Sequence, residues 1–407
     1  MGDEQATERS MVPLKDVLRR VETGWSPVCE PRLPAADEWG VLKLSAVTSG
    51  RFVAAEAKAL PKGVAPRPRL EVKPGDVLVS RANGVKALVG VVCPVGDVRP
   101  GLMVPDLVFR LVADPEVLDP RYLAIALASG GLRSQVDEVM RGSSGQYKIS
   151  QADVRTLRVP RLALDQQRRI VAAHDAFERR IGALESMAAK KALLLDALIE
   201  QLVSFGKEDL VPLEDAGVAI DAGVTLGAHR VPHLRPTGYL RVANVRKGWI
   251  EGDIARLEAM ERDHRRYSLT PGDLLVVEGH ADPEQIGRCA MVGPEQSGLL
   301  YQNHLFRLRF DDALPEFAML WLNSRAVRVY WKSRTATSSG LYTINSRLLE
   351  AVPFPRASRD TQDRVVGVWK AESRTLSLMR QRIAKLRLIQ RAAIEDLLVG
   401  RKGVSAT

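Results

Sequence analysis

Apolar residues recur at alternating three- and four-residue intervals along two stretches of the chain, residues 164–203 and 361–399. Sustained spacing of this kind predicts a helix that packs along its whole length against another helix. A stretch of this length forms a helix of roughly 60 Å at about 1.5 Å per residue. We therefore expect two long helices that pair with each other. The positions expected to form this pairing are Ile170, Phe177, Ile181, Leu184, Leu195 and Leu198 in the first helix and Val365, Trp369, Leu376, Met379, Ile383 and Leu386 in the second, with Lys191, Glu372 and Gln390 as polar exceptions.

A region of mixed character precedes each long helix. It combines short β-rich runs with Gly and Pro turns, and it ends in a helical piece, residues 120–140 in the first region and 315–331 in the second. The pattern predicts an α+β fold in which two similar globular α/β domains are each followed by a long helix. The expected divisions are 1–160 for the first domain, 161–206 for the central helix, 207–356 for the second domain and 357–403 for the C-terminal helix.

The two halves of the chain repeat each other. Residues 142–149 (GSSGQYKI) return at 337–344 (TSSGLYTI), a shift of 195, and PGDVLV at 74–79 returns as PGDLLV at 271–276, a shift of 197. Further blocks recur in the same order, and the sequence between the blocks differs greatly. Such a pattern indicates a duplicated framework. The divergent stretches are then the parts in which the two halves differ in function.

Charge and composition narrow the class of protein. The chain carries 59 Lys and Arg against 49 Asp and Glu, a net charge of +10, and the segment from Arg359 to Lys402 alone holds eleven basic and five acidic residues. This excess permits a polyanionic partner such as DNA. The longest apolar runs are far shorter than a membrane span, and three scattered cysteines suit reduced thiols. We expect a cytoplasmic protein without membrane contact.

No catalytic or cofactor motif stands out in either half. The sequence has no phosphate-binding GxxxxGK[ST] loop, no GxGxxG after a strand, no Asn-Pro-Pro-aromatic stretch and no His or Cys spacing typical of a metal site. We therefore expect no catalytic residue, no metal and no cofactor bound by this chain.

Polar loops directly after one repeated strand are the best candidates for reading DNA. Arg, Lys, Asn and Gln read base edges, while Lys, Arg and hydroxyl groups bind phosphates. The loop at 81–86 offers such residues in the first half, and the divergent loop at 278–288 replaces it in the second. The repeated GSSGQYK-type loop suits contact with phosphates or packing better than base selection. The predicted DNA-binding residues are Arg81, Asn83, Lys86, Ser144, Gln146, Tyr147 and Lys148 in the first half and Arg246, Lys247, His280, Gln285, Arg288, Ser339 and Tyr342 in the second.

The ordered duplication resembles the specificity subunit of type I restriction-modification enzymes. The motifs that carry the resemblance are the Val-Pro steps at 159–160 and 352–353, the QRRIV helix start at 167–171, the Pro-Gly-Asp turns and the LLVGR ending at 397–401. The resemblance implies that each globular domain recognises one half of a split, asymmetric target in double-stranded DNA. It also implies that the helices pair as an antiparallel coiled coil, which sets the spacing and holds two modification subunits.

The resemblance places the chemistry in partner subunits. S-adenosylmethionine and the methyl-transfer site are expected in the modification subunits. Restriction or translocase subunits can join the same assembly, and the sequence does not decide whether they do. Two alternatives stay open from the sequence. One is a specificity-like DNA-binding subunit of another defence or modification system, and the other is a coiled-coil interaction scaffold without DNA contact.

Overall fold

The computed structural model describes residues 9–142, 145–335 and 342–400. The chain forms two compact units, the first from Met1–Glu185 with Gln381–Thr407 and the second from Ser186–Arg380. Each unit therefore combines one globular domain with parts of both long helices. The predicted division kept the helices apart from the domains, whereas the boundary between the compact units runs through the middle of each helix.

The first unit is built around an antiparallel sheet of four strands in the order β2-β9-β5-β7. A second sheet, β4-β3-β8, and two short ladders, β1-β11 and β10-β6, complete it. Buried side chains of β5 and β9 face the helices α1 and α2 and form one core with them. The elements are β1 Met11–Pro13, β2 Leu18–Thr23, β3 Gly40–Leu42, β4 Ala57–Ala59, β5 Val77–Ser80, β6 Ala82–Asn83, β7 Val92–Pro94, β8 Leu102–Met103, β9 Val108–Ala113, α1 Pro120–Leu127, α2 Gly130–Val139, β10 Tyr147–Lys148, α3 Gln151–Thr156 and β11 Arg158–Pro160.

The second unit repeats this topology strand for strand. Its four-stranded sheet has the order β13-β20-β16-β18, its three-stranded sheet is β15-β14-β19, and its short ladders are β12-β22 and β17-β21. The duplication read from the sequence is therefore a duplication of structure. The elements are β12 Leu210–Pro212, β13 Val218–Ala222, β14 Pro236–Leu240, β15 Ala255–Glu258, α5 Glu261–Tyr267, β16 Leu274–Val277, β17 Gly279–His280, β18 Cys289–Met291, β19 Leu300–Tyr301, β20 Leu305–Phe310, α6 Pro315–Leu322, α7 Arg325–Arg334, β21 Tyr342–Thr343, α8 Ser346–Glu350 and β22 Pro353–Pro355.

Both Pro-Gly-Asp motifs form a tight turn that feeds a buried strand. Gly75 and Gly272 adopt φ values of +88° and +96°, which favour glycine because side chains crowd the backbone there. The carboxylate of Asp76 accepts the Lys73 N–H at 2.9 Å, and that of Asp273 accepts the Thr270 N–H at the same distance. These two aspartates therefore hold the turns that start β5 and β16.

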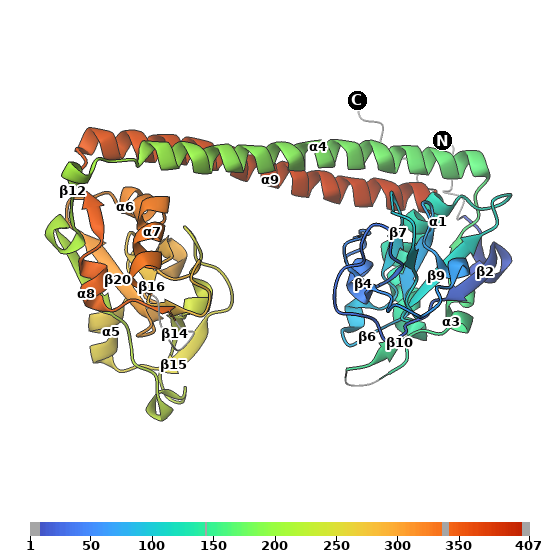
Figure 1. Cartoon of the computed structure of the whole chain (residues 1–407), viewed down its shortest axis with the longest axis horizontal. Coiled ribbons are helices and arrows are strands. Elements are labelled where there is room, and N and C mark those ends of the chain that lie inside the picture. The colour runs from blue at the N-terminus through green and yellow to red at the C-terminus, as the bar shows by residue number, and fades with distance from the viewer. Residues whose placement is uncertain (1–8, 143–144, 336–341, 401–407) are drawn as a thin grey trace, which may run out of the picture. The chain divides into compact units, whose positions relative to one another are not determined.

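The long helices are α4, Leu164–Leu202, and α9, Arg359–Val399 (Figure 1). In the first unit, Gln390 donates to Glu178 at 2.8 Å and Arg387 to Glu185 at 2.7 Å. The residue numbers rise along α4 as they fall along α9, so the pairing is antiparallel, as the resemblance implied.

The polar exceptions in the predicted seam find partners. In the second unit, Lys191 of α4 forms an ion pair with Glu372 of α9. In the first unit, Gln390 is 6% exposed and bonds to Glu178. Paired polar groups at such positions fix which residues of the two helices face each other, because any other alignment would leave them unpaired.

One predicted pairing residue is placed wrongly by the sequence pattern. Ile170, Ile181, Leu195, Val365 and Leu376 are buried, but Leu198 is 37% exposed. The last turns of α4 pack instead through Ile199 and Val203 against the core of the second globular domain. The last turns of α9 do the same in the first unit through Ile394 and Leu398. The buried face shifts because these turns pack against a domain. The remaining predicted positions, Phe177, Leu184, Trp369, Met379, Ile383 and Leu386, are partly buried.

A buried glutamine ties the start of each long helix to its globular domain. Gln167 accepts the Asp119 N–H at 2.8 Å and donates to the Leu162 carbonyl at 2.9 Å. Gln362, 195 residues later, accepts the Leu314 N–H at 2.8 Å and donates to the Ala357 carbonyl at 3.0 Å. This joint is therefore part of the duplicated framework.

We expect Gln167→Ala to lower the free energy of unfolding by about 1–3 kcal/mol, because it removes a buried side chain and leaves the partly buried Asp119 N–H without its partner. Denaturant titration of the purified chain would measure the change. Gln166→Ala is the matched control, since Gln166 is exposed on the same turn and should change the stability by less than about 0.5 kcal/mol. Equal effects of the two substitutions would contradict the role of the joint.

Candidate nucleic-acid interface

Many of the predicted DNA-binding residues of the first unit meet in one short ladder. Strand β6 pairs antiparallel with β10, so that Asn83 lies opposite Tyr147 and Ala82 opposite Lys148. We call this pair of strands the first tip ladder. It joins the variable loop at 81–86 to the repeated loop at 145–149, although some sixty residues separate them in sequence. Exposed Lys86, Gln146 and Lys148 lie in these two loops.

The second unit has the same ladder with different side chains. Strand β17 pairs antiparallel with β21, so that His280 lies opposite Tyr342. We call this pair the second tip ladder. A tyrosine therefore stands opposite a variable polar residue in both units. Ser144 and Ser339, also predicted as DNA-binding, lie outside the described residues.

Asn83 and His280 are oriented in the same way by their own backbones. The Asn83 side-chain oxygen accepts the Val85 N–H at 2.9 Å, and the His280 Nδ1 accepts the Asp282 N–H at 2.9 Å. Because Nδ1 accepts, the neutral ring of His280 carries its proton on Nε2. Asn83 therefore retains its amide N–H donors and His280 its Nε2–H donor. Side chains fixed in this way lose little conformational entropy when they contact a base edge.

Arg81 lies beside the first tip ladder and is partly buried. Its guanidinium carbon is 5.2 Å from the ring centroid of Phe109, a cation–π contact, and its Nε is buried without a hydrogen-bond partner among the described residues. The backbone of Arg81 is held on both sides, by Leu107 at 2.9 Å and by Ile149 at 2.9 Å. The flat guanidinium is thus supported by an aromatic ring at the edge of the ladder.

Two predicted residues near the second tip ladder support the loop rather than extend from it. Arg288 is only 3% exposed, and its guanidinium donates to Gln285 at 2.7 Å and to the Val242 carbonyl at 2.8 Å. Burial, and then the charges of Arg246 and Arg328, lower the pKa of Arg288. The prediction that Arg288 contacts DNA does not fit this burial. Gln285 is partly exposed and carries the acceptor for Arg288.

Arg246 and Lys247 find their described contacts away from the strands of the second tip ladder. Arg246 forms an ion pair with Glu251 at 2.7 Å. Lys247 lines a cavity of about 440 Å³ with Trp249, Leu195 of α4 and Trp369 of α9. This loop therefore faces the long helices, which does not favour the prediction that it reads bases.

The structure adds two residues that the sequence did not single out. Glu278 directly precedes β17, and its carboxylate lies 2.6 Å from Nδ1 of His304. The His304 side chain is 59% exposed and that of Glu278 is 28% exposed. Glu278 belongs to the loop compared with 81–86, but nothing in the sequence links it to His304, because the contact depends on the pairing of β16 with β20.

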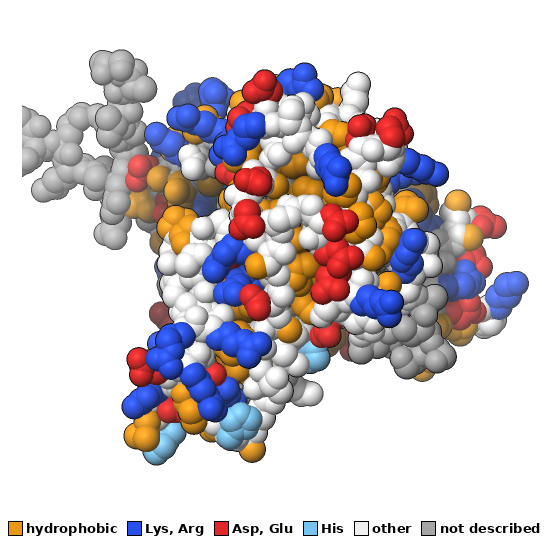
Figure 2. Space-filling view, turned by 90° about the vertical axis from the view of Figure 1, so that its left-hand side faces the viewer, with side chains coloured by type: hydrophobic (Ala, Val, Ile, Leu, Met, Phe, Trp, Pro, Cys, Tyr) orange, Lys and Arg blue, Asp and Glu red, His pale blue; other side chains and the backbone are white. Residues whose placement is uncertain are grey.

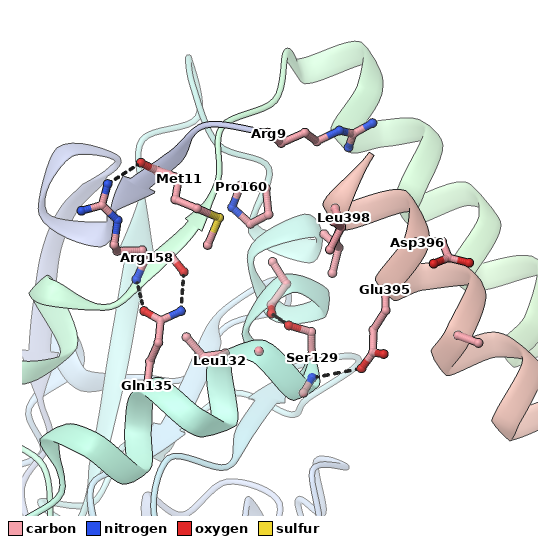
Figure 3. A pocket seen from close by; sticks show the side chains of 15 residues that line it. Arg9, Met11, Ser129, Leu132, Gln135, Arg158, Pro160, Glu395, Asp396 and Leu398 are labelled. Carbon is pink, nitrogen blue, oxygen red and sulfur yellow. Dashed lines mark hydrogen bonds between the residues drawn. The ribbon is translucent and has the colours of Figure 1, made fainter. Parts of the chain in front are cut away.

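The cavity in Figure 3 lies where the end of α9 packs on the first globular domain. It measures about 600 Å³, and Glu395 of α9 accepts the Gly130 N–H of α2 there at 3.2 Å. Glu200 of α4 accepts the Arg325 N–H of α7 at 2.9 Å in the second unit. A carboxylate at a helix N-terminus is favoured by the helix dipole. The cavity therefore lies at the contact between the end of a long helix and a globular domain, and this contact is repeated in the two units.

The described ranges 9–142, 145–335 and 342–400 contain no group of three or more His, Cys, Asp or Glu side chains placed to hold a metal ion. Among the helices of these ranges, none combines the length with the apolar composition that a membrane-spanning helix needs.

Comparison with known proteins connects this architecture to a family. No protein-family model matches the sequence. The chain is 31% identical over 191 residues to the type I restriction enzyme EcoEI specificity subunit of Escherichia coli, covering 46% of this chain and 32% of that protein. It is 23% identical over 332 residues to the EcoKI specificity subunit of Escherichia coli strain K12, covering 75% and 69%. The chain is therefore similar in sequence to type I restriction specificity subunits.

One solved structure shares the fold over nearly the whole chain. A chain from a structure of the type I restriction-modification system, described as the basis of its complex assembly and conformational transition, superimposes with a TM-score of 0.60. The match covers 97% of this chain and 99% of the other at 17% identity. The chain spans about a third of the length of the EcoEI specificity subunit, and about two thirds of the EcoKI specificity subunit.

Proposed function

We propose that this chain is the sequence-specific DNA-binding subunit of a type I restriction-modification complex. Each globular domain reads one half of a bipartite, asymmetric target, and the paired helices set the spacing. The chain is non-catalytic, and methyl transfer with S-adenosylmethionine, like DNA cleavage, takes place in partner subunits in the cytoplasm. One observation carries the proposal: two ladders with the same backbone hydrogen bonds present different side chains, which suits two readers of different sequences.

The electrostatics of the second unit support contact with DNA phosphates. Exposed basic side chains gather between residues 229 and 266, and Figure 2 shows Lys, Arg and His side chains together at one corner of this unit. Two arginines of this segment form ion pairs with acidic residues: Arg230 is bound to Asp263, and Arg265 forms an exposed ion pair with Glu261. Apart from Lys247, which lines the cavity beside the long helices, the exposed cations and histidines of this segment are His229, His233, Arg235, Arg256, Arg262, His264, Arg265 and Arg266.

An exposed apolar pair on each helix supports the docking of two modification subunits. Leu193 and Leu194 of α4 are 71% and 70% exposed. Leu388 and Ile389 of α9, which occupy the repeat-equivalent positions, are 59% and 43% exposed. Exposed apolar side chains on a helix that already has a partner suit contact with another protein. Because the pair occurs once in each unit, it suits a partner that binds in two copies.

We expect the purified chain to bind duplex DNA weakly and to bind it specifically once a modification subunit is present. Affinity should fall by about 10³ or more between 50 and 200 mM salt if six or more phosphates are engaged, because binding releases counterions. Titration of fluorescent duplexes with the co-expressed complex at several salt concentrations would measure the slope. A complex that does not bind DNA, or whose affinity ignores salt, would favour an interaction scaffold without DNA contact.

A further inference from the structure

Arg81 and Glu278 occupy the same place in the two units. The Arg81 N–H donates to the Leu107 carbonyl at 2.9 Å, and the Glu278 N–H donates to the His304 carbonyl at 3.0 Å. The carbonyl of Arg81 accepts the Ile149 N–H at 2.9 Å, and that of Glu278 accepts the Ile344 N–H at 2.7 Å. Both residues also stand directly before a tip ladder. One position of the framework therefore displays a guanidinium in the first unit and a carboxylate in the second.

The surroundings of this position change together with its charge. In the first unit the guanidinium of Arg81 rests against Phe109, and the neighbouring residue is the apolar Leu107. In the second unit the residue that replaces Leu107 is His304, whose imidazole lies 2.6 Å from the Glu278 carboxylate. The exchange of Arg for Glu is thus accompanied by a partner that holds one carboxylate oxygen and offsets its charge when protonated. A bare carboxylate would be repelled by DNA phosphates, and the imidazole reduces that penalty when it is protonated.

The two side chains select opposite hydrogen-bonding edges. A guanidinium only donates, and in the major groove guanine presents two acceptors, O6 and N7. An ionised carboxylate only accepts, and it has room for donors beyond the imidazole. Cytosine and adenine present an exocyclic amine there, N4 and N6 respectively.

We propose, on the basis of the function proposed above, that Glu278 is a specificity-determining residue that accepts a hydrogen bond from the exocyclic amine of a cytosine or adenine in the half-target of the second domain. His304 positions the carboxylate and does not select the base. Arg81, at the same framework position, selects guanine in the other half-target. The two domains therefore read their targets through one shared position with inverted chemistry.

The test uses the full chain co-expressed with its modification subunits and a duplex library randomised across both half-targets. Glu278→Gln should relax the preference at one position of the second half-target by roughly tenfold or more, because the amide no longer only accepts. If the base read is adenine, the Gln variant keeps part of the preference, since Gln pairs with adenine N6 and N7. If it is cytosine, the preference at that position moves toward adenine. The first half-target should be unchanged, which also shows that the variant folds and assembles.

Three further variants make the result decisive. Glu284→Gln removes the same charge from the same loop, where Glu284 is exposed and paired with Lys332, and should leave every base preference unchanged. Glu278→Arg should move the preference at the affected position to guanine, as at Arg81. His304→Ala should weaken binding without changing which base is preferred.

Different outcomes of these experiments would contradict the role of Glu278 and the proposed function of the chain. An unchanged second half-target in Glu278→Gln and Glu278→Arg complexes that still recognise DNA would overturn the inference alone. The same holds for a loss of base preference in His304→Ala with Glu278 intact, or for equal effects of Glu278→Gln and Glu284→Gln. A wild-type complex that selects no bipartite sequence from the library would overturn the proposed function itself.

Discussion

Inserting four residues into each long helix, after Glu185 in α4 and after Arg380 in α9, is expected to lengthen the gap between the two half-targets by about one or two base pairs. Four residues add about 6 Å of rise and keep the apolar seam nearly in phase. Duplex DNA advances about 3.4 Å per base pair. Both insertion points lie at the boundary between the compact units, so the contacts within each unit are kept. Both half-target sequences should therefore stay the same.

Insertion of two residues at the same places is the matched control. It adds about 3 Å but turns each seam by about 200°, so that apolar positions face away from the partner helix. We expect this variant to lose helix pairing and assembly. Mapping of methylated sites in DNA from cells that express each complex gives the readout. An unchanged gap after the four-residue insertions, or altered half-targets with the gap preserved, would show that the helices do not set the spacing.

Combined replacement of Arg81 and Asn83 by Ala is expected to abolish recognition of one half-target and leave the other intact. Each lost base contact should cost about 1–3 kcal/mol and relax the choice of base at its position. Both residues lie at the first tip ladder, whose strands are held by the repeated framework, so the substitution should not disturb the second unit. Selection of bound duplexes from a randomised library measures each half-target separately.

His280→Ala with Gln285→Ala is the reciprocal variant and should affect only the other half-target. Gln285 accepts a hydrogen bond from the buried Arg288, so part of its effect arises from a loosened loop. Equal losses in both half-targets, from either double variant, would count against separate readers. If neither half-target changes, the tip ladders do not contact the DNA bases.

The helices and the duplicated framework were predictable because their signals are local and repeated. The three/four spacing identified Ile181 and Leu376, both buried, and the Pro-Gly-Asp turns lead into β5 and β16 as expected. The same spacing wrongly predicted that Leu198 is buried between the helices; it is 37% exposed. Periodicity reports which face of a helix is apolar, but it does not say whether that face meets another helix or a globular domain. The last turns of α4 meet a domain, and the buried position is therefore Ile199.

The candidate site was predictable only in part, because it depends on strand pairing between distant segments. The sequence placed Asn83 and Tyr147 in separate loops, and the antiparallel pairing of β6 with β10 sets them opposite each other. The sequence also suggested that Arg288 contacts DNA. In the structure Arg288 is buried and donates hydrogen bonds to Gln285 and to the Val242 carbonyl. His304 carried no sequence signal at all, since its role rests on its contact with Glu278 across neighbouring strands. Exposure and cross-strand contact are properties of the fold.

The central claim, that two similar domains read two different half-targets, is tested most directly by mapping methylated sites in DNA from cells that express the wild-type chain with its modification subunits. We expect a single bipartite, asymmetric sequence: two short specified blocks separated by a gap of fixed length and unspecified sequence. A continuous recognition sequence, two identical blocks, or methylation without sequence preference would contradict it.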